Sequence, residues 1–274
     1  MTAESPKICI GIPTLNGPER LARCLASIVK HTPLKEYEAQ VLVSDDFSYD
    51  KHLAENTKVC LNYGADLLLA PARIGVAQQW NRLTLHTNAE IVILMNDDVE
   101  VVRDWLEALV FTIKENSHAG MVGLKAYEGV NSTNFTPPPV KSYNEAVMEH
   151  GHGMFSATGF LFGFERRKYN AVGGFDPAFF AFYEELDFGF KLTQEGWPSF
   201  MLSYPIVLHQ GGATTSDRMN VDAKKVFNES REKFNAKYKS LSEVRLSAIV
   251  SDIMSSSLSL PRVQWNTMLK TWND

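Results

Sequence analysis

The sequence predicts an α/β fold in which a mostly parallel central sheet is flanked by helices. In the first half of the chain, short apolar, β-branched runs alternate with stretches of helical spacing. The runs start at intervals of roughly 24 to 33 residues, which is the length of one βαβ unit. Near-continuous apolar strands of this kind are typical of a parallel sheet covered on both faces by helices.

The first half supplies the strands and helices of this sheet in alternation. The expected strands are residues 7–12, 40–45, 66–70, 90–95 and 120–124. The expected helices are residues 19–30, 50–64, 76–86 and 104–116. In the first helix, one face carries the apolar residues Leu21, Leu25, Ile28 and Val29.

The second half has a different character. Residues 133–146 include three consecutive prolines and predict an irregular loop. Residues 154–176 are strand-like and end in a turn at Gly173 and Gly174. A helix at 184–196, a strand at 199–212 and a charged, exposed helix at 221–240 complete the pattern.

Composition narrows the class of protein. The chain has 274 residues, 45% of them hydrophobic, and a net charge of -5, which argues against nucleic acid as a partner. Three separated cysteines, Cys9, Cys24 and Cys60, favour reduced thiols and a cytoplasmic location over a disulfide framework or a zinc site. The N-terminus lacks a secretory signal, and no run of about 18 apolar residues predicts a transmembrane helix.

Polar clusters follow three of the predicted strands, at residues 13–16, 45–46 and 96–98. In open α/β sheets, ligands bind beyond the carboxyl ends of the strands, so these clusters mark the expected site. The stretch GIPTLNG does not fit the glycine pattern of dinucleotide-binding folds, and no phosphate-binding GxxxxGK[ST] loop occurs. Carboxylates at this edge would suit a divalent cation that bridges a diphosphate.

The motifs together resemble a known family. IGIPTLNGPERLARCLASI, VLVSDD, APARIGVAQQWNR and ILMNDDVEV resemble the nucleotide-sugar half of glycosyltransferase family 2 enzymes of the GT-A fold. ATGFLFGFERRKYNAVGGFDPAFFAFYEELDFGFKL and VLHQGG resemble the acceptor side of the same family. The resemblance covers about residues 7 to 212, and its strength lies in the order of the motifs.

The resemblance implies a GT-A, Rossmann-like sheet with a smaller mixed acceptor-side sheet and C-terminal helices. One catalytic domain, 1–240, would combine a nucleotide-sugar half (7–128) with an acceptor half (129–240), followed by a helical or irregular tail (241–274). The implied activity is metal-dependent, inverting transfer of a sugar from a nucleoside diphosphate sugar to a hydroxyl of a glycan acceptor. UDP or dTDP is favoured as the nucleotide of the donor. The sequence does not specify the oligomeric state, and a homo-oligomer is possible.

For the metal, the resemblance points to Asp98, Asp97 and His209. Asp98 is expected as a direct ligand, Asp97 as a ligand or a ribose contact, and His209 as an imidazole on the metal or diphosphate. Mn²⁺ or Mg²⁺ would neutralise the departing diphosphate, and an imidazole ligand tilts the preference towards Mn²⁺. A plain alternative is that the aspartates cap the helix beginning near Arg103, although Asp104 is better placed to do so.

For the nucleotide sugar, the resemblance implies contacts from several separate stretches of the chain. Asp45 or Asp46 would accept hydrogen bonds from the nucleobase, but Phe47 follows this pair where the family usually has glycine. Further candidates are Pro13, Thr14, Arg73, Asn81 and Gly159. Ordinary loop polarity explains the polar members of this set equally well.

For the acceptor, the resemblance assigns a general base to the acidic start of the helix at 184–196. The family normally places Asp at the second position of this acidic pair, whereas this chain has Glu185, which leaves Glu184 as the second candidate. Carboxylates also stabilise a helix N-terminus without any catalytic role. Two other functions remain open: a sugar-phosphate nucleotidyltransferase, and a non-catalytic module that binds sugar nucleotides or glycans.

Overall fold

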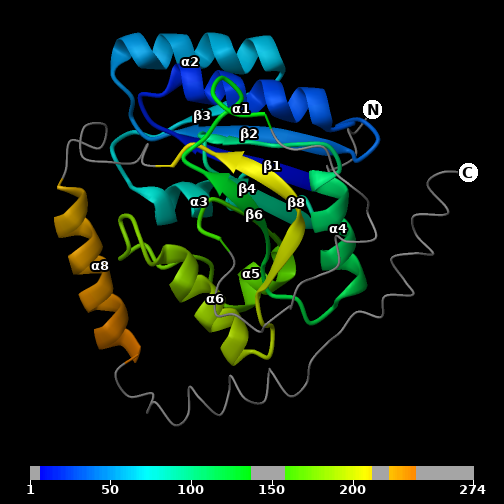
Figure 1. Ribbon diagram of the computed structural model, residues 1–274. Helices are drawn as coiled ribbons and strands as arrows, with labels where there is room; N and C mark the ends of the chain where they lie inside the picture. Colours follow the sequence, from blue (N-terminus) through cyan, green and yellow to red (C-terminus); the bar gives the residue numbers. More distant parts are fainter. Residues whose placement is uncertain (1–6, 137–157, 212–221, 239–274) are drawn as a thin grey trace, which may run out of the picture.

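The computed structural model of the chain describes residues 7–136, 158–211 and 222–238 (Figure 1). The predicted tail at 241–274 and most of the proline-bearing loop at 133–146 lie outside these residues.

The predicted α/β fold is confirmed. The strands are β1 (Ile8–Thr14), β2 (Ala39–Asp45), β3 (Asp66–Leu69), β4 (Ile91–Met95), β5 (Val99–Glu100), β6 (Val122–Glu128), β7 (Leu161–Glu165) and β8 (Phe200–His209). They form one eight-stranded sheet in the order β3-β2-β1-β4-β7-β6-β8-β5. The first four strands in this order pair in parallel, as expected for successive βαβ units.

The rest of the same sheet is mixed and combines β7 and β8 of the second half with β5 and β6 of the first. β7 pairs antiparallel with both β4 and β6, β6 pairs parallel with β8, and the two-residue β5 pairs antiparallel with the end of β8. This last pairing places Val99 opposite His209. The late histidine is thereby brought next to the end of β4.

The helices lie on both faces of the sheet. They are α1 (Pro18–His31), α2 (Asp50–Tyr63), α3 (Val76–Leu85), α4 (Trp105–Glu115), α5 (Arg166–Ala171), α6 (Glu184–Gln194) and α8 (Ala223–Tyr238). Alternate residues of β1 separate two cores: Ile8 and Ile10 pack with α1, α2 and α4, whereas Cys9 packs with α3 and α6. Figure 1 shows α1 and α2 on one side of the sheet and α3 and α6 on the other.

Two details differ from the sequence prediction. Val29 is 49% exposed, because it lies about 100° around α1 from the buried Ile28. The strand predicted at 154–176 corresponds to β7, but residues Arg166–Ala171 of the same stretch form the helix α5 instead. Tertiary contacts hold α5: the fully buried Lys168 pairs with Glu165 at 2.6 Å and donates to the Ala119 carbonyl at 2.6 Å.

Among the described helices, none combines the length and the apolar character needed to cross a bilayer.

Candidate active site

The polar clusters predicted at strand ends gather at one edge of the sheet. Thr14 and Asp45 stand opposite each other in the β1–β2 register, and the Asp46 amide donates to the Thr14 carbonyl at 2.9 Å. Thr14 also donates its hydroxyl to Asp97 at 2.7 Å, which joins the end of β1 to the turn after β4. Pro13 precedes Thr14 in β1, so the candidates from all three strands meet here.

Asp97 is paired inside the protein. Arg20 donates to its two carboxylate oxygens at 3.2 and 3.0 Å, and both side chains are about nine-tenths buried. Burial raises the pKa of Asp97, the Arg20 charge opposes that rise, and the neighbouring Asp98 charge adds to it. With both oxygens engaged, Asp97 is less well placed than Asp98 to bind a metal directly.

Asp98 and His209 face each other. The buried Asp98 Oδ1 has no hydrogen-bond partner among the described residues, and His209 Nε2 lies 3.4 Å away. The other ring nitrogen, Nδ1, lies 2.7 Å from Glu128, and the ring stacks on Phe160 with centroids 4.4 Å apart. Burial alone would lower the pKa of His209, but Asp98 and then Glu128 outweigh it and raise the pKa.

Asp98 and His209 fit a divalent cation whose remaining coordination positions are filled by the phosphates of a substrate. No group of three or more Asp, Glu, His or Cys side chains is arranged around a metal position within the described ranges. The orphaned carboxylate oxygen of Asp98 and the adjacent imidazole supply two donors. Mg²⁺ and similar hard cations are commonly held by one or two carboxylates plus substrate phosphates, so two protein donors are sufficient.

The acidic residues that follow have other partners. Glu100 accepts hydrogen bonds from Arg23 at 3.2 Å and from the Ser132 amide at 3.3 Å, so its carboxylate is not directed to the Asp98–His209 pair. β5 separates Asp97 and Asp98 from α4, which removes the capping explanation for them. Asp104 occupies the position before α4, although its side chain makes no capping hydrogen bond.

Asp45 and Asp46 are buried at the end of β2, where the sequence predicts the nucleotide, and they accept hydrogen bonds from the neighbouring loops. Asp45 accepts from the Ser48 amide at 2.7 Å and from Asn56 at 2.8 Å. Asp46 accepts from the Ile74 amide and from Gln79, both at 2.8 Å.

Arg73 and Asn81 lie in different surroundings. Arg73 Nε lies 3.3 Å from Asp46, so this arginine does meet the predicted nucleotide side. Asn81 instead forms hydrogen bonds with the backbone of Phe175 and with the Tyr169 hydroxyl. It does not line the cavity between Glu185 and His209. Its visible role is to hold the turn that leads towards α6.

The acidic start of α6 is held in an unusual backbone conformation. Phe182 and Tyr183, just before the helix, have φ values of 66° and 70°, in the left-handed region that non-glycine residues seldom adopt. Burial, and then the charge of Glu185, raise the pKa of Glu184 well above its usual range, and burial also raises the pKa of Glu185. A carboxylate with a raised pKa is a stronger proton acceptor.

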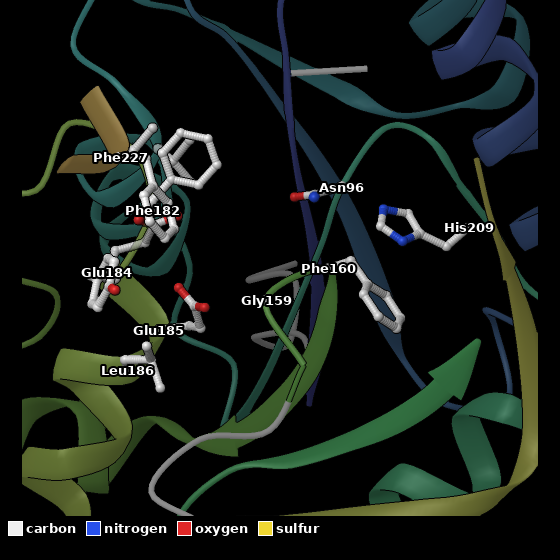
Figure 2. Close-up of a pocket in the computed structure, with 12 residues that line it drawn as sticks. Asn96, Gly159, Phe160, Phe182, Glu184, Glu185, Leu186, His209 and Phe227 are labelled. Atoms are coloured by element: carbon white, nitrogen blue, oxygen red, sulfur yellow. The ribbon is translucent and has the colours of Figure 1, made fainter. Parts of the chain in front are cut away.

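A cavity of about 370 Å³ connects this helix start to His209. Figure 2 shows Phe182, Phe227, Glu184, Glu185 and Leu186 on one side, with Asn96, Phe160 and His209 on the other. Gly159 lies between them, and a Cβ at this position would come within 3.1 Å of the Glu185 carboxyl group. Glycine therefore lets the backbone approach this carboxyl group closely.

Several residues of the site are not predicted by the sequence. Arg20 and Glu128 hold Asp97 and His209, but a single charged residue in a helix or strand carries no signal for a distant partner. Phe227 lines the cavity from α8, a helix expected only to be exposed. A signal for its inward side existed: Phe227 and Phe234 are seven residues apart, which places them on one face.

Comparison with known families gives one match. Residues 9–182, more than half of the chain, match the family described as Glycosyl transferase family 2. A comparison with curated proteins finds no match.

Solved structures with the same fold include glycosyltransferases of different origin. Residues 1–349 of S. aureus TarS match with a TM-score of 0.62 and 17% identity over 94% of this chain and 73% of TarS 1–349, and another structure of this fragment contains UDP-GlcNAc. GalNAc-T7 with UDP, GalNAc and Mn²⁺ matches at 0.61 and 18% identity, over 92% of this chain and 55% of its own. The mannosyltransferase PcManGT from Pyrobaculum calidifontis, with GDP-Man and Mn²⁺, matches at 0.59 and 16% identity, over 97% and 84%.

Proposed function

This chain belongs to glycosyl transferase family 2, and we propose that it catalyses metal-dependent transfer of a sugar, with inversion, from a nucleoside diphosphate sugar to a glycan hydroxyl. The family match covers residues 9–182 and favours glycosyl transfer over nucleotidyl transfer. UDP or dTDP remains the favoured nucleotide. A non-catalytic binding module is an outcome of the experiment below.

One observation carries the proposal. The cavity has the carboxyl group of Glu185 on one side and His209 on the other (Figure 2). His209 Nε2 lies 3.4 Å from Asp98 Oδ1, a buried oxygen that accepts no hydrogen bond from the described residues. An inverting transfer needs this separation, because the acceptor attacks the anomeric carbon from the face opposite the departing diphosphate. The two groups can therefore serve the acceptor and the leaving group at the same time.

On the donor side, Asp98 and His209 would hold Mn²⁺ or Mg²⁺ against the diphosphate. When bound, the ion neutralises negative charge that develops on the departing diphosphate. The presence of Mn²⁺ in the structures of GalNAc-T7 and PcManGT supports this choice of ion. Asp97, held by Arg20 and Thr14, would position the turn that presents Asp98 or contact the ribose.

The nucleoside would lie over the strand ends of β1 and β2. Pro13, Thr14, Asp45 and Asp46 line this edge, and Arg73 approaches it through Asp46. Since the Asp45 and Asp46 oxygens already accept hydrogen bonds from the protein, we assign these carboxylates first to shaping the base pocket. The UDP-GlcNAc found in TarS supports a uridine nucleotide as the first donor to test.

On the acceptor side, Glu185 would act as general base. Its carboxylate takes the proton of the acceptor hydroxyl while that oxygen forms a bond to the anomeric carbon. The bond between the anomeric carbon and the diphosphate oxygen breaks with its electron pair on the diphosphate. Gly159 leaves room for this carboxylate, and Glu184, whose side chain is buried, is the second candidate.

We also propose that residues 1–240 act as one catalytic domain built from the halves 7–128 and 129–240. Strands of both halves alternate within the eight-stranded sheet, since β7 lies between β4 and β6. Such a sheet supports folding of the two halves as a unit.

The test is binding followed by turnover. Calorimetry should detect UDP binding that depends on Mn²⁺ and is lost in Asp98→Ala. Glu185→Gln should bind UDP normally but release nucleoside diphosphate from UDP-, dTDP- and GDP-sugars about 10²- to 10⁴-fold more slowly. Glu195→Gln, an exposed substitution at the other end of α6, is the matched control.

Each outcome is informative. Binding of UDP without any donor turnover would identify a sugar-nucleotide-binding module. Wild-type turnover in both Asp98→Ala and Glu185→Gln would contradict the assigned roles. NMR analysis of the product's anomeric configuration tests inversion directly.

A further inference from the structure

α8 is packed against the acceptor side of the cavity. Its Phe234 ring lies 5.5 Å from Tyr183 and 6.4 Å from Phe190, and its Tyr238 ring lies 4.2 Å from Phe190. Figure 1 shows α8 running beside α6. The helix lies outside residues 9–182, to which the family match extends.

Polar contacts from α8 fix the irregular segment 176–183 that leads into α6. The buried Ser230 hydroxyl donates to the Ala181 carbonyl at 2.8 Å, and Lys233 donates to the Ala178 carbonyl at 2.9 Å. Lys237 lies 2.6 Å from both Asp176 and the fully buried Asp187. These contacts satisfy two carbonyl groups and the Asp176 carboxylate of the irregular segment, and they tie it to the Asp187 carboxylate of α6.

The same helix contributes Phe227 to an aromatic wall, which we define as Phe227 together with Phe182 and Tyr183, the two residues before α6. Phe227 lies 5.5 Å from Phe182 in an edge-to-face arrangement and 5.4 Å from Tyr183. All three line the cavity, and Phe227 remains 40% exposed. The left-handed backbone at Phe182 and Tyr183 is energetically unfavourable for non-glycine residues, and the packing against α8 helps to hold it.

The position of the wall indicates what it contacts. Phe182 and Phe227 lie on the Glu185 side of the cavity, away from His209 (Figure 2). A general base must lie within hydrogen-bond distance of the acceptor hydroxyl. The ring that bears this hydroxyl would therefore extend towards the aromatic wall, while the diphosphate occupies the His209 side.

We propose that Phe227 of α8 is an acceptor-binding residue, and that the aromatic wall packs against the C–H face of the acceptor sugar ring. The proposal rests on the proposed function, because it uses Glu185 to define the acceptor side. A pyranose presents C–H groups on its faces and hydroxyls at its edge, so a flat aromatic surface can bury the former while leaving the latter free to react. An acceptor that consists of a flexible alkyl chain has no such face.

The experiment uses the full chain with UDP and Mg²⁺, which avoids the paramagnetic broadening of Mn²⁺. Saturation-transfer NMR measures binding of methyl β-glucoside, methyl β-galactoside and methyl N-acetyl-β-glucosaminide, with n-hexanol as the aliphatic comparison. We expect the wild type to bind at least one glycoside. Phe227→Ala should weaken that binding about tenfold, and Phe227→Leu nearly as much, because the loss is of the aromatic face.

Two comparisons separate contact from structure. Phe227→Trp should restore glycoside binding, and Phe227→Ala should keep its affinity for UDP within about twofold. Lys225→Ala, an exposed substitution on the same helix, is the matched control. Equal glycoside affinity of wild type and Phe227→Ala overturns the proposal, as does tighter binding of n-hexanol or failure of every glycoside to bind.

Failure of the proposed function would be seen separately. A wild-type protein that binds glycosides but neither UDP nor any donor contradicts the proposed transfer while the aromatic wall stands. Glycoside binding is therefore measured with and without UDP.

Discussion

Asp97 and Asp98 are neighbours in the chain, yet they have different surroundings. Asp97 is neutralised by Arg20 and accepts the Thr14 hydroxyl, whereas Asp98 Oδ1 has no hydrogen-bond partner among the described residues. A buried carboxylate oxygen left without a donor costs free energy unless something else satisfies it. This difference is the reason why we propose Asp98 as the ligand of the cation and Asp97 as a support of the turn.

Replacement of Arg20 tests the supporting role of Asp97. Arg20→Met should lower the free energy of unfolding by about 3 kcal/mol, because it leaves the buried Asp97 charge without its partner. Chemical denaturation measures the loss. Arg103→Met, at a site with an 88% exposed side chain, should change stability by less than about 0.5 kcal/mol.

The double variant Arg20→Met/Asp97→Asn should recover part of that loss, because it removes the unpaired charge as well. An Arg20→Met protein as stable as the Arg103→Met control would show that Asp97 does not depend on this pairing.

Glu184 gives a pH-dependent prediction. Burial and the Glu185 charge raise its pKa in the folded protein, so the folded state binds its proton more tightly than the unfolded state. The stability that this proton provides is present below the unfolded pKa of about 4.3 and is lost as the pH rises through the folded pKa. Glu184→Gln should therefore stabilise the protein at pH 8 by roughly 1 kcal/mol, and by less at pH 5.

Denaturation of wild type and Glu184→Gln at both pH values measures this difference. A stabilisation of equal size at pH 5 and pH 8 would contradict the assigned pKa shift.

At the scale of elements, α6 and α8 depend on each other. α6 begins with two adjacent acidic side chains, the buried Glu184 and the half-buried Glu185, and repulsion between them opposes this arrangement. Contacts from α8 stabilise this part of the protein. Lys237 forms ion pairs with Asp176 and Asp187, and the Tyr238 hydroxyl donates a hydrogen bond to Asp187 at 2.7 Å. The start of α6 is thus held by contacts that its own sequence does not contain.

Lys237 tests this dependence. Lys237→Ala should destabilise the docking of α8 by about 1 to 2 kcal/mol, because the fully buried Asp187 loses its closest cation. Hydrogen exchange of the α8 amides should speed up accordingly, and nucleoside diphosphate release should slow.

Lys237→Arg, which keeps the charge, should restore both properties. Lys225→Ala, whose partner Glu229 is 3.9 Å away on the surface, should change neither. If Lys237→Ala exchanged as slowly as wild type, α8 would not depend on this bridge.

At the scale of the whole molecule, one sheet organises both sides of the cavity. The parallel strands β1, β2 and β4 present at their ends the carboxylates that we propose for the donor side, and the antiparallel β7 leads out from Gly159 and Phe160. β8 returns to the same edge with His209. α8 then covers the side of the cavity that we propose binds the acceptor, so the cavity is lined by segments from most of the described chain.

The sequence by itself determined the α/β class, because apolar periodicity reports which face of each element is buried. It also predicted that the strand-end carboxylates lie together, since ligands of such sheets collect at strand ends. The acidic start of α6 and the late histidine became candidates through the resemblance to the family. α5 escaped prediction because its stability comes from Lys168 and its tertiary contacts. No periodic signal records contacts of that kind.

Only the tertiary structure decided which candidates face the cavity. It joined Asp98 to His209, turned Asn81 towards Phe175, and brought Phe227 beside Glu185. Each of these outcomes depends on partners far apart in the chain and on side-chain direction. Local propensity specifies neither, because a polar residue at a strand end looks the same in sequence whether it binds a ligand or another part of the protein.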